Sequence, residues 1–289
     1  MSIKSIIAPV RGDGKGESVL GLALAIGRKF NSHIDVLHVH AKPEDMIPFG
    51  VPVPRMFRQT IMDAAGNIAH QEEARLRAIF DDYCARHNAQ MMSADATDCP
   101  PDRLTISWRE EAGKQVSVIR DLGTLADLIV VARPDEDTEL GMNSLMCALF
   151  DVRKLTAVAP PQVPEMAGNR IAIAWNGSGE AARAVTWALP LLLQAEKVTV
   201  LMAPDENNSA GTDEGLRRYL CLHGIQPESR TFKIGRRDIG GPLLEAVQKD
   251  GADMLVMGAF GAEKRRELVL GGVTQHVVEN AELPLIMAH

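Results

Sequence analysis

Apolar residues along this chain form short continuous runs that alternate with stretches of helical spacing, and the whole alternation occurs twice. The run "SIIAPV" at 5–10 is followed by a helix-like stretch and then by the run "IDVLHV". The run "RIAIAW" at 170–175 begins the same order again. Runs that are apolar on both faces and alternate with helices indicate parallel strands covered on both sides. With right-handed crossovers, the pattern predicts an α/β protein of two tandem doubly wound parallel-sheet domains, each Rossmann-like.

The ends of the two copies correspond as well as their beginnings. "ADLIVVARP" and "LTAVAP" close the first copy, whereas "ADMLVMGAF" and "LPLIMAH" close the second. A repeat distance of roughly half the chain indicates a duplicated domain and not a solenoid of short repeats. The proline-rich stretch "PPQVPEMAG" lies between the copies. We therefore place the boundary near Gln162, with domains at 1–161 and 162–289.

In the second copy, the pattern predicts strands near 170–175, 197–203, 229–233, 253–258 and 284–288. Helices are expected near 178–194, 212–223, 239–250 and 272–281. The first copy carries an insertion near 41–60, where four prolines and a glycine disfavour a regular helix. A long helix is expected after it, at about 57–88. Long insertions of this kind are usually lids, interface pieces or loops.

Composition narrows the class of protein. The 289 residues are 46% hydrophobic, which predicts a packed core. The net charge of −7 argues against a nucleic-acid-binding protein, which needs a basic face. No apolar run reaches the roughly 20 residues that span a bilayer, and the first residues do not resemble a signal peptide. We expect a soluble, cytoplasmic protein without a membrane partner.

The strongest chemical signal is the stretch "GAFGAEKRRELVLGGVT" at 258–274. It lies between a predicted strand and a predicted helix, and glycines there let backbone N–H groups approach an anion closely. The N–H groups of Gly272, Val273 and Thr274 are unpaired donors at the helix start, where the helix dipole adds positive charge. The stretch also contains Lys264, Arg265 and Arg266. A glycine-rich turn without a ligand remains the alternative.

This order of strand, "WNGS", helix, strand, glycine stretch and final "LPLIMAH" resembles the universal stress protein family, over nearly the whole chain as a tandem pair. ATP-binding members carry Gly-x-x-Gly, nine residues, then Gly followed by Ser or Thr. Gly258, Gly261 and Gly271 match the three glycines. The resemblance implies a site for ATP or another adenine nucleotide, with or without Mg²⁺, in the C-terminal domain. Its residues would be Ala174, Asn176, Met257, Gly258, Gly261, Gly271, Gly272, Val273 and Thr274.

Two positions depart from the family's pattern. Gly272 stands where the family has Ser or Thr, so the hydroxyl is lost or displaced to Thr274. The family often has Asp after the first strand, but Asn176 and Arg11 stand there in the second and first copies. In the first copy the glycine stretch is replaced by "ARPDEDTELGMNS", whose acids and side chains would repel and obstruct a triphosphate. We therefore expect one nucleotide site per chain.

Other candidates carry weaker signals. His38 and His40 share one face of a strand, but no third ligand has convincing spacing for a metal site. The four cysteines, Cys84, Cys99, Cys147 and Cys221, form no metal-binding spacing and are expected to be free thiols. Ser178 fits a helix N-cap. No nucleophile is paired with a base, so neither catalytic residues nor metal ligands are assigned.

The resemblance implies a stress-response module with a regulatory or protective role and at most slow ATP hydrolysis. Two alternatives remain open from the sequence: an interaction or signalling protein that binds no nucleotide, and a nucleotide hydrolase. The family commonly dimerises through the edge strand at the end of the domain. We therefore expect an intramolecular pseudo-dimer in which 155–159 meets 284–288, and a homodimer of whole chains is a further expectation.

Overall fold

A computed structural model of the chain describes residues 2–40, 55–98, 100–135, 141–162, 166–203, 213–233, 239–261 and 272–289. The elements of the first half are β1 (Ser5–Val10), α1 (Gly16–Phe30), β2 (His33–His40), α2 (Arg55–His87), β3 (Gln90–Met92), β4 (Thr105–Ala112), α3 (Gln115–Gly123), β5 (Leu128–Ala132), α4 (Met142–Met146), the π-helical segment η2 (Cys147–Val152) and β6 (Leu155–Ala159). Those of the second half are β7 (Arg170–Trp175), α5 (Gly179–Trp187), α6 (Leu189–Leu193), β8 (Lys197–Met202), α7 (Glu214–Leu222), β9 (Glu228–Thr231), α8 (Gly240–Asp250), β10 (Met254–Gly258), α9 (Gly272–Asn280) and β11 (Leu285–Ala288).

The described strands form one sheet in the order β3-β4-β2-β1-β5-β6-β11-β10-β7-β8-β9. Strands are parallel within each half, and the halves join where β6 and β11 pair antiparallel, with Leu285 opposite Val158. The prediction that 155–159 meets 284–288 is therefore confirmed. Within each half the strand order reverses beside the first strand, between β1 and β5 and between β7 and β10. The sequence-based prediction of an α/β, mostly parallel, Rossmann-like fold is also confirmed.

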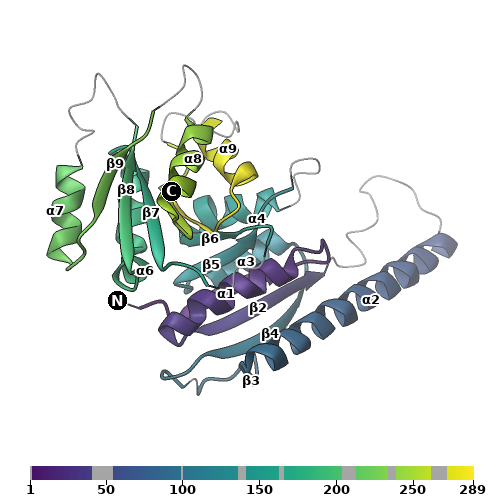
Figure 1. Cartoon of the computed structure of the whole chain (residues 1–289). Helices are drawn as coiled ribbons and strands as arrows, with labels where there is room; N and C mark the ends of the chain where they lie inside the picture. The colour runs from purple at the N-terminus through teal and green to yellow at the C-terminus, as the bar shows by residue number, and fades with distance from the viewer. Residues whose placement is uncertain are drawn as a thin grey trace.

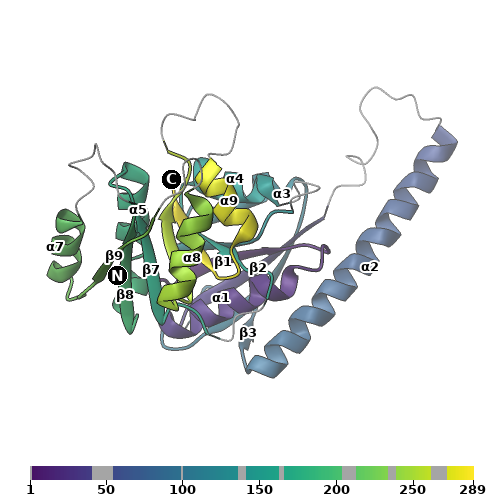
Figure 2. The same ribbon diagram turned by 45° about the horizontal axis from the view of Figure 1, so that its top comes forward.

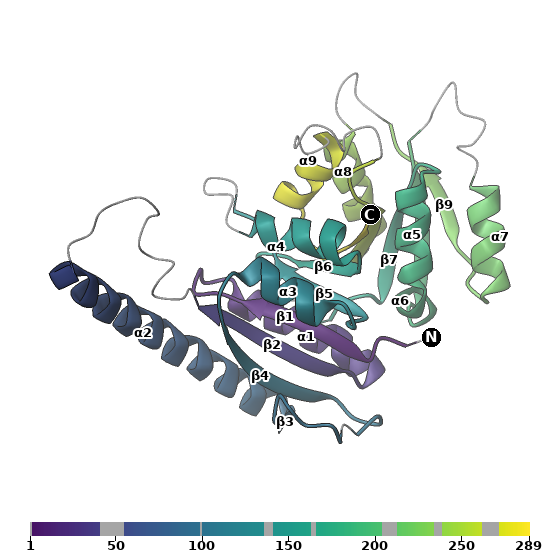
Figure 3. The same ribbon diagram turned by 180° about the vertical axis from the view of Figure 1, so that it is seen from behind.

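Helices cover both faces of the sheet, because successive strand residues point to opposite sides. One hydrophobic cluster lies under α1, α2, α5, α6 and α7. The other lies under α3, α4, η2, α8 and α9. Figure 1 shows α1 in front of the first half of the sheet, and Figure 3 shows α3 in front of it from the opposite side. Each cluster contains residues of both halves, so the two halves share their core.

Most predicted elements of the second half agree with the structure within two residues. The prediction of a single helix at 178–194 is wrong, since this region forms two helices, α5 and α6. Pro190 lies in the first turn of α6, where its missing N–H is tolerated, and cannot continue the preceding helix. The predicted boundary at 161 and 162 falls between β6 and β7, but the division into domains stays a prediction.

The long helix α2 runs along the outer side of the first half, at the opposite end of the molecule from α7 (Figure 2). Its Glu72 carboxylate accepts a hydrogen bond from the backbone N–H of Gly12 at 2.9 Å. This contact ties α2 to the turn after β1. Of the insertion predicted near 41–60, residues 41–54 lie outside the described residues. The remaining residues, 55–60, form the start of α2. No helix of the described chain combines the length and the apolar character that crossing a membrane requires.

Candidate functional site

The second half has a pocket at the carboxyl ends of β7 and β10, where the strand order reverses. Doubly wound sheets bind ligands at this place, since the helices that follow the two strands diverge to opposite faces. Asn176 directly follows β7, and Gly258 is the last residue of β10. The pocket volume is about 430 Å³, within the range of small-molecule sites.

The pocket brings together all the predicted site residues that the structure describes. Its lining includes Ala174, Asn176, Met257, Gly258, Gly261, Gly272, Val273 and Thr274. Gly271 was also assigned to the site and lies outside the described residues. The residues come from two strand ends and from the start of α9, which are separated by up to about 100 positions in the chain.

Further lining residues were not found from the sequence. They are Trp175, Ser178, Glu180, Leu201, Ala203, Phe232, Ile239, Leu243 and Phe260. Most are apolar, and they build a wall from the ends of β8 and β9 and the start of α8. Trp175, Ala203 and Phe232 lie at or directly after strand ends, which is a signal that sequence reasoning can use, because such positions line the carboxyl edge of a parallel sheet.

Close packing explains the glycine at position 258 but not the glycines at positions 261 and 272. A Cβ atom at Gly258 would lie 2.5 Å from the backbone nitrogen of Ala181, so this glycine lets β10 approach the start of α5. At Gly261 and Gly272, a Cβ atom would meet no other atom of the described residues within 4 Å. The packing of the described chain therefore does not by itself require glycine at these two positions. A side chain there would enter the open space of the pocket.

Thr274 is buried, with 7% of its surface exposed. Its hydroxyl oxygen accepts a hydrogen bond from the backbone N–H of Phe260 at 3.3 Å. The sequence suggested that this hydroxyl and the N–H groups of 272–274 face an anion. In the structure the hydroxyl oxygen is already used to hold the segment after β10, so its first role is to shape the pocket.

The turn after β7 is held by local hydrogen bonds. The Asn176 side-chain oxygen accepts from the N–H of Ser178 at 3.1 Å, and the Ser178 hydroxyl accepts from the N–H of Ala181 at 3.2 Å. The second contact confirms Ser178 as the N-cap of α5. Gly177 between them has a φ of +72°, which favours glycine. The turn thereby fixes the amide of Asn176 at the pocket wall.

The described pocket wall carries one acidic group and no basic group. Glu180 is 8% exposed, and its carboxylate lies 3.2 Å from the guanidinium of Arg183. Lys264, Arg265 and Arg266, which the sequence suggested as phosphate partners, lie outside the described residues. Positive character on the described wall therefore comes from the N-terminus of α9.

The corresponding place in the first half is filled by its own side chains. The cavity there measures about 10 Å³ and is lined by residues that include Arg11, Lys15 and Gly141. The Arg11 guanidinium lies 3.5 Å from Asp13, and a Cβ at Gly141 would lie 2.7 Å from it. The Lys15 ammonium donates to the carbonyl of Arg133 at 3.0 Å.

These contacts bear on the expected loss of the first site. Acids and side chains of the first copy were expected to repel and obstruct a triphosphate. In the described part of that copy, Lys15 pairs with Asp135 at 3.5 Å, and Arg11 and Lys15 line the small cavity. Residues 136–140, which carry the other acids, lie outside the described residues.

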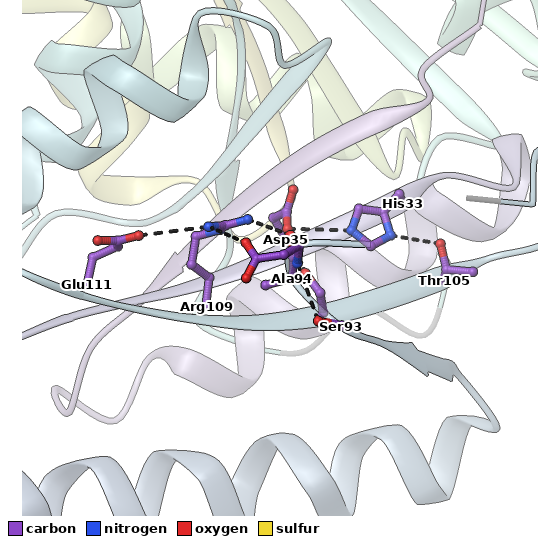
Figure 4. A network of polar contacts seen from close by, with 9 residues as sticks. His33, Asp35, Ser93, Ala94, Thr105, Arg109 and Glu111 are labelled. Atoms are coloured by element: carbon purple, nitrogen blue, oxygen red, sulfur yellow. Dashed lines mark hydrogen bonds and ion pairs between the residues drawn. The ribbon is translucent and has the colours of Figure 1, made fainter. Parts of the chain in front are cut away.

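A polar network on the first half contains a hydroxyl, an imidazole and a carboxylate in sequence (Figure 4). The Thr105 hydroxyl lies 2.8 Å from His33 Nδ1, and His33 Nε2 lies 3.4 Å from the Asp35 carboxylate. Thr105 is only 1% exposed, so no substrate reaches its hydroxyl. Arg109, nearby, donates to the carbonyl of Ala94 and ties the loop after β3 to the sheet. We interpret the network as structural.

His38 and His40, the other candidates from the sequence, lie on the face of β2 that carries Trp108 of β4. The His38 ring stacks on Trp108 with centroids 5.9 Å apart, and His38 is buried. Among the described residues, no three His, Cys, Asp or Glu side chains are grouped to hold a metal ion. Cys84, Cys147 and Cys221 are free thiols, as expected, and Cys99 lies outside the described residues.

Comparison with known proteins agrees with this fold. The model of the universal stress protein family matches residues 168–289. A universal stress protein from Archaeoglobus fulgidus DSM 4304 is 14% identical, with a TM-score of 0.66 over 98% of this chain and 97% of that one. A putative universal stress protein from Pseudomonas aeruginosa UCBPP-PA14 is also 14% identical, with a TM-score of 0.57 over 99% of this chain and 93% of that one.

No curated protein matches the sequence. The similarity to these two solved structures shows a shared fold along the whole chain, although the sequences are only 14% identical. The family model covers the half that contains the pocket. The second half of the chain therefore matches the model of the universal stress protein family, and the whole chain shares the fold of a solved universal stress protein.

Proposed function

We propose that the pocket of the second half binds ATP or another adenine nucleotide, at one site per chain. The observation that carries the proposal is the contrast between the two halves. The pocket between β7 and β10 has a volume of about 430 Å³, whereas the equivalent place in the first half has about 10 Å³.

The chemistry of the wall fits the two ends of a nucleotide. Leu201, Phe232, Ile239 and Leu243 offer an apolar surface for a planar base. Gly261 and Gly272 leave open space at the start of α9, and the unpaired N–H groups of a helix N-terminus favour a phosphate. The Asn176 amide also lines the pocket and suits a ribose hydroxyl, since it both donates and accepts.

The role that we propose for the bound nucleotide is regulatory or protective, in a stress response of the cytoplasm. The described wall offers a single carboxylate, Glu180, so Mg²⁺ would enter together with the phosphates of ATP and not on a protein site of its own. An interaction protein that binds no nucleotide is the competing function, and Gly272 at the position where the family has Ser or Thr favours it.

The first experiment is mass spectrometry of ligand released from the purified, denatured protein, followed by calorimetric titration with ATP and ADP. Gly261→Val and Gly272→Val should each weaken binding at least about a hundredfold, because the new side chain fills the pocket. Both variants should stay folded, because a Cβ at either position meets no atom within 4 Å in the part of the chain that the structure describes.

Gly215→Val is the matched control. Gly215 lies in α7, and a Cβ there also meets no atom within 4 Å, but it does not line the pocket. This variant should bind nucleotide like the natural chain. An empty purified protein and no titration signal at millimolar nucleotide would refute nucleotide binding and leave the interaction protein as the function.

A further inference from the structure

The segment that follows β10 is held in its conformation from three sides. Ala259 donates its backbone N–H to the carbonyl of Ala288 at 2.9 Å, and its own carbonyl lies 2.9 Å from Nδ1 of His289. Phe260 donates to the hydroxyl of Thr274. The third side is supplied by the first half of the chain.

Phe260 needs such support because its backbone is in the left-handed region, with a φ of +51°. Residues other than glycine adopt this conformation only at a cost in free energy, and bulky side chains adopt it rarely. Phe260 also lines the nucleotide-sized pocket and immediately precedes Gly261, so its conformation decides where Gly261 lies.

The support from the first half is Phe150, in η2. Its ring centroid lies 5.4 Å from that of Phe260 and 4.3 Å from that of His289, at interplanar angles of 46° and 43°. Tilted aromatic pairs at these separations are favourable beyond the burial of their surface. The ring of Phe150 therefore packs against both the strained residue and the C-terminal residue that holds Ala259.

A second contact, a hydrogen bond, also joins the two halves. Arg133, directly after β5, donates to the carbonyl of Ala281, directly after α9, at 3.4 Å. The segment after β5 thus contacts the second half next to α9, and the segment after β10 contacts η2 of the first half. In the first half this contact borders a filled cavity, whereas in the second half it borders the open pocket.

From this geometry we propose that Phe150 is a positioning residue for the pocket of the second half. The first half, whose own cavity is filled, serves as a built-in partner that holds the segment 259–261 in its binding conformation. The binding part of this inference rests on the proposed function, whereas the conformational part does not depend on any ligand.

The test compares Phe150→Ala with Phe150→Tyr, which keeps the ring, and with Val152→Ala. Val152 lies in the same π-helical segment but borders Gly123 of α3, so it is the control for a general loss of packing. Circular dichroism and thermal unfolding establish that each variant is folded. Hydrogen exchange of backbone amides in the ligand-free protein and calorimetric titration with ATP are then measured.

We expect Phe150→Ala to accelerate exchange of the Phe260 amide by about tenfold and to weaken ATP binding by about fivefold to tenfold, the effect of losing a favourable aromatic pair. Amides of α7, at the far edge of the second half, should exchange as before. Phe150→Tyr should restore both properties, and Val152→Ala should alter neither.

The outcomes separate the two proposals. Unchanged exchange at Phe260 in Phe150→Ala, or an equal effect of Val152→Ala, overturns the positioning role. Accelerated exchange in a protein that binds no ATP supports the positioning role and refutes the proposed function. Normal ATP affinity together with accelerated exchange overturns the part of the inference that concerns binding.

Discussion

The hydroxyl oxygen of Thr274 accepts a hydrogen bond from the backbone N–H of Phe260 at 3.3 Å, in the buried floor of the pocket. Thr274 lies in the first turn of α9, and Phe260 lies just after β10, so the bond joins the two ends of the glycine stretch. Because the backbone of Phe260 has a φ of +51°, the bond also helps to hold this left-handed conformation.

Replacement of Thr274 by Val should therefore destabilise the protein. The Phe260 N–H would remain buried without its acceptor, which costs about 1–3 kcal/mol. Urea unfolding measures this change in the free energy of unfolding. Thr274→Ser keeps the hydroxyl and should lose less than half as much. Equal stabilities of the Val variant and the natural chain would show that the bond is not formed in solution.

Replacement by Ala should destabilise the protein at Gly258 but leave its stability nearly unchanged at Gly261. A Cβ at Gly258 would lie 2.5 Å from the nitrogen of Ala181, so Gly258→Ala must push α5 away from β10 and should cost about 1–3 kcal/mol. Gly261→Ala meets open space and should change the free energy of unfolding by less than about 0.5 kcal/mol. Thermal and urea unfolding of the two variants side by side provide the check, and similar losses would contradict the packing at Gly258.

Nucleotide should bind to the chain with a stoichiometry of one. The first half has no room, because Arg11 and Lys15 fill its cavity and are held there by Asp13, Asp135 and the carbonyl of Arg133. Calorimetric titration with ATP measures the number of sites. Two equivalent sites would mean that these two side chains leave the cavity when nucleotide arrives.

The network around Asp35 should make stability depend on pH in the acid range. Burial raises the pKa of the Asp35 carboxyl, but hydrogen bonds from His33 and Ser107 outweigh this effect, so the pKa lies below its ordinary value. A carboxyl whose pKa is lowered on folding stabilises the protein above its unfolded pKa of about 3.9, and this stability is lost as the pH falls through the folded value.

We therefore expect Asp35→Asn to be less stable than the natural chain near neutral pH, with a difference that shrinks as the pH falls below about 4. Urea unfolding across this range gives the free energies. Glu245→Gln, which removes an exposed carboxylate on α8, is the control and should give a small difference with little pH dependence. A difference between Asp35→Asn and the natural chain that stays constant with pH would show that the charge of Asp35 does not contribute.

The sequence by itself determined the fold class, the duplication and the place of the pocket. These features depend on local patterns, since apolar periodicity sets strands and helices, and parallel strands place their ends at one edge. The strand at 170–175 followed from such patterns, whereas the meeting of β6 with β11 was implied by the resemblance to the universal stress protein family. Eight of the nine predicted site residues lie together for the same reason, because strand ends and the start of α9 converge on one edge of the sheet.

Only the tertiary structure decided which side chains fill, close or shape the two cavities. Lys15 reaches the carbonyl of Arg133 across 118 positions, and Phe150 meets Phe260 from the other half of the chain. Such contacts leave no periodicity in the sequence, because they depend on the three-dimensional distance between side chains that the sheet order brings together. For this reason the part that Arg11 and Lys15 play in the first cavity was not predicted, and neither was the contact of the two halves around Phe260.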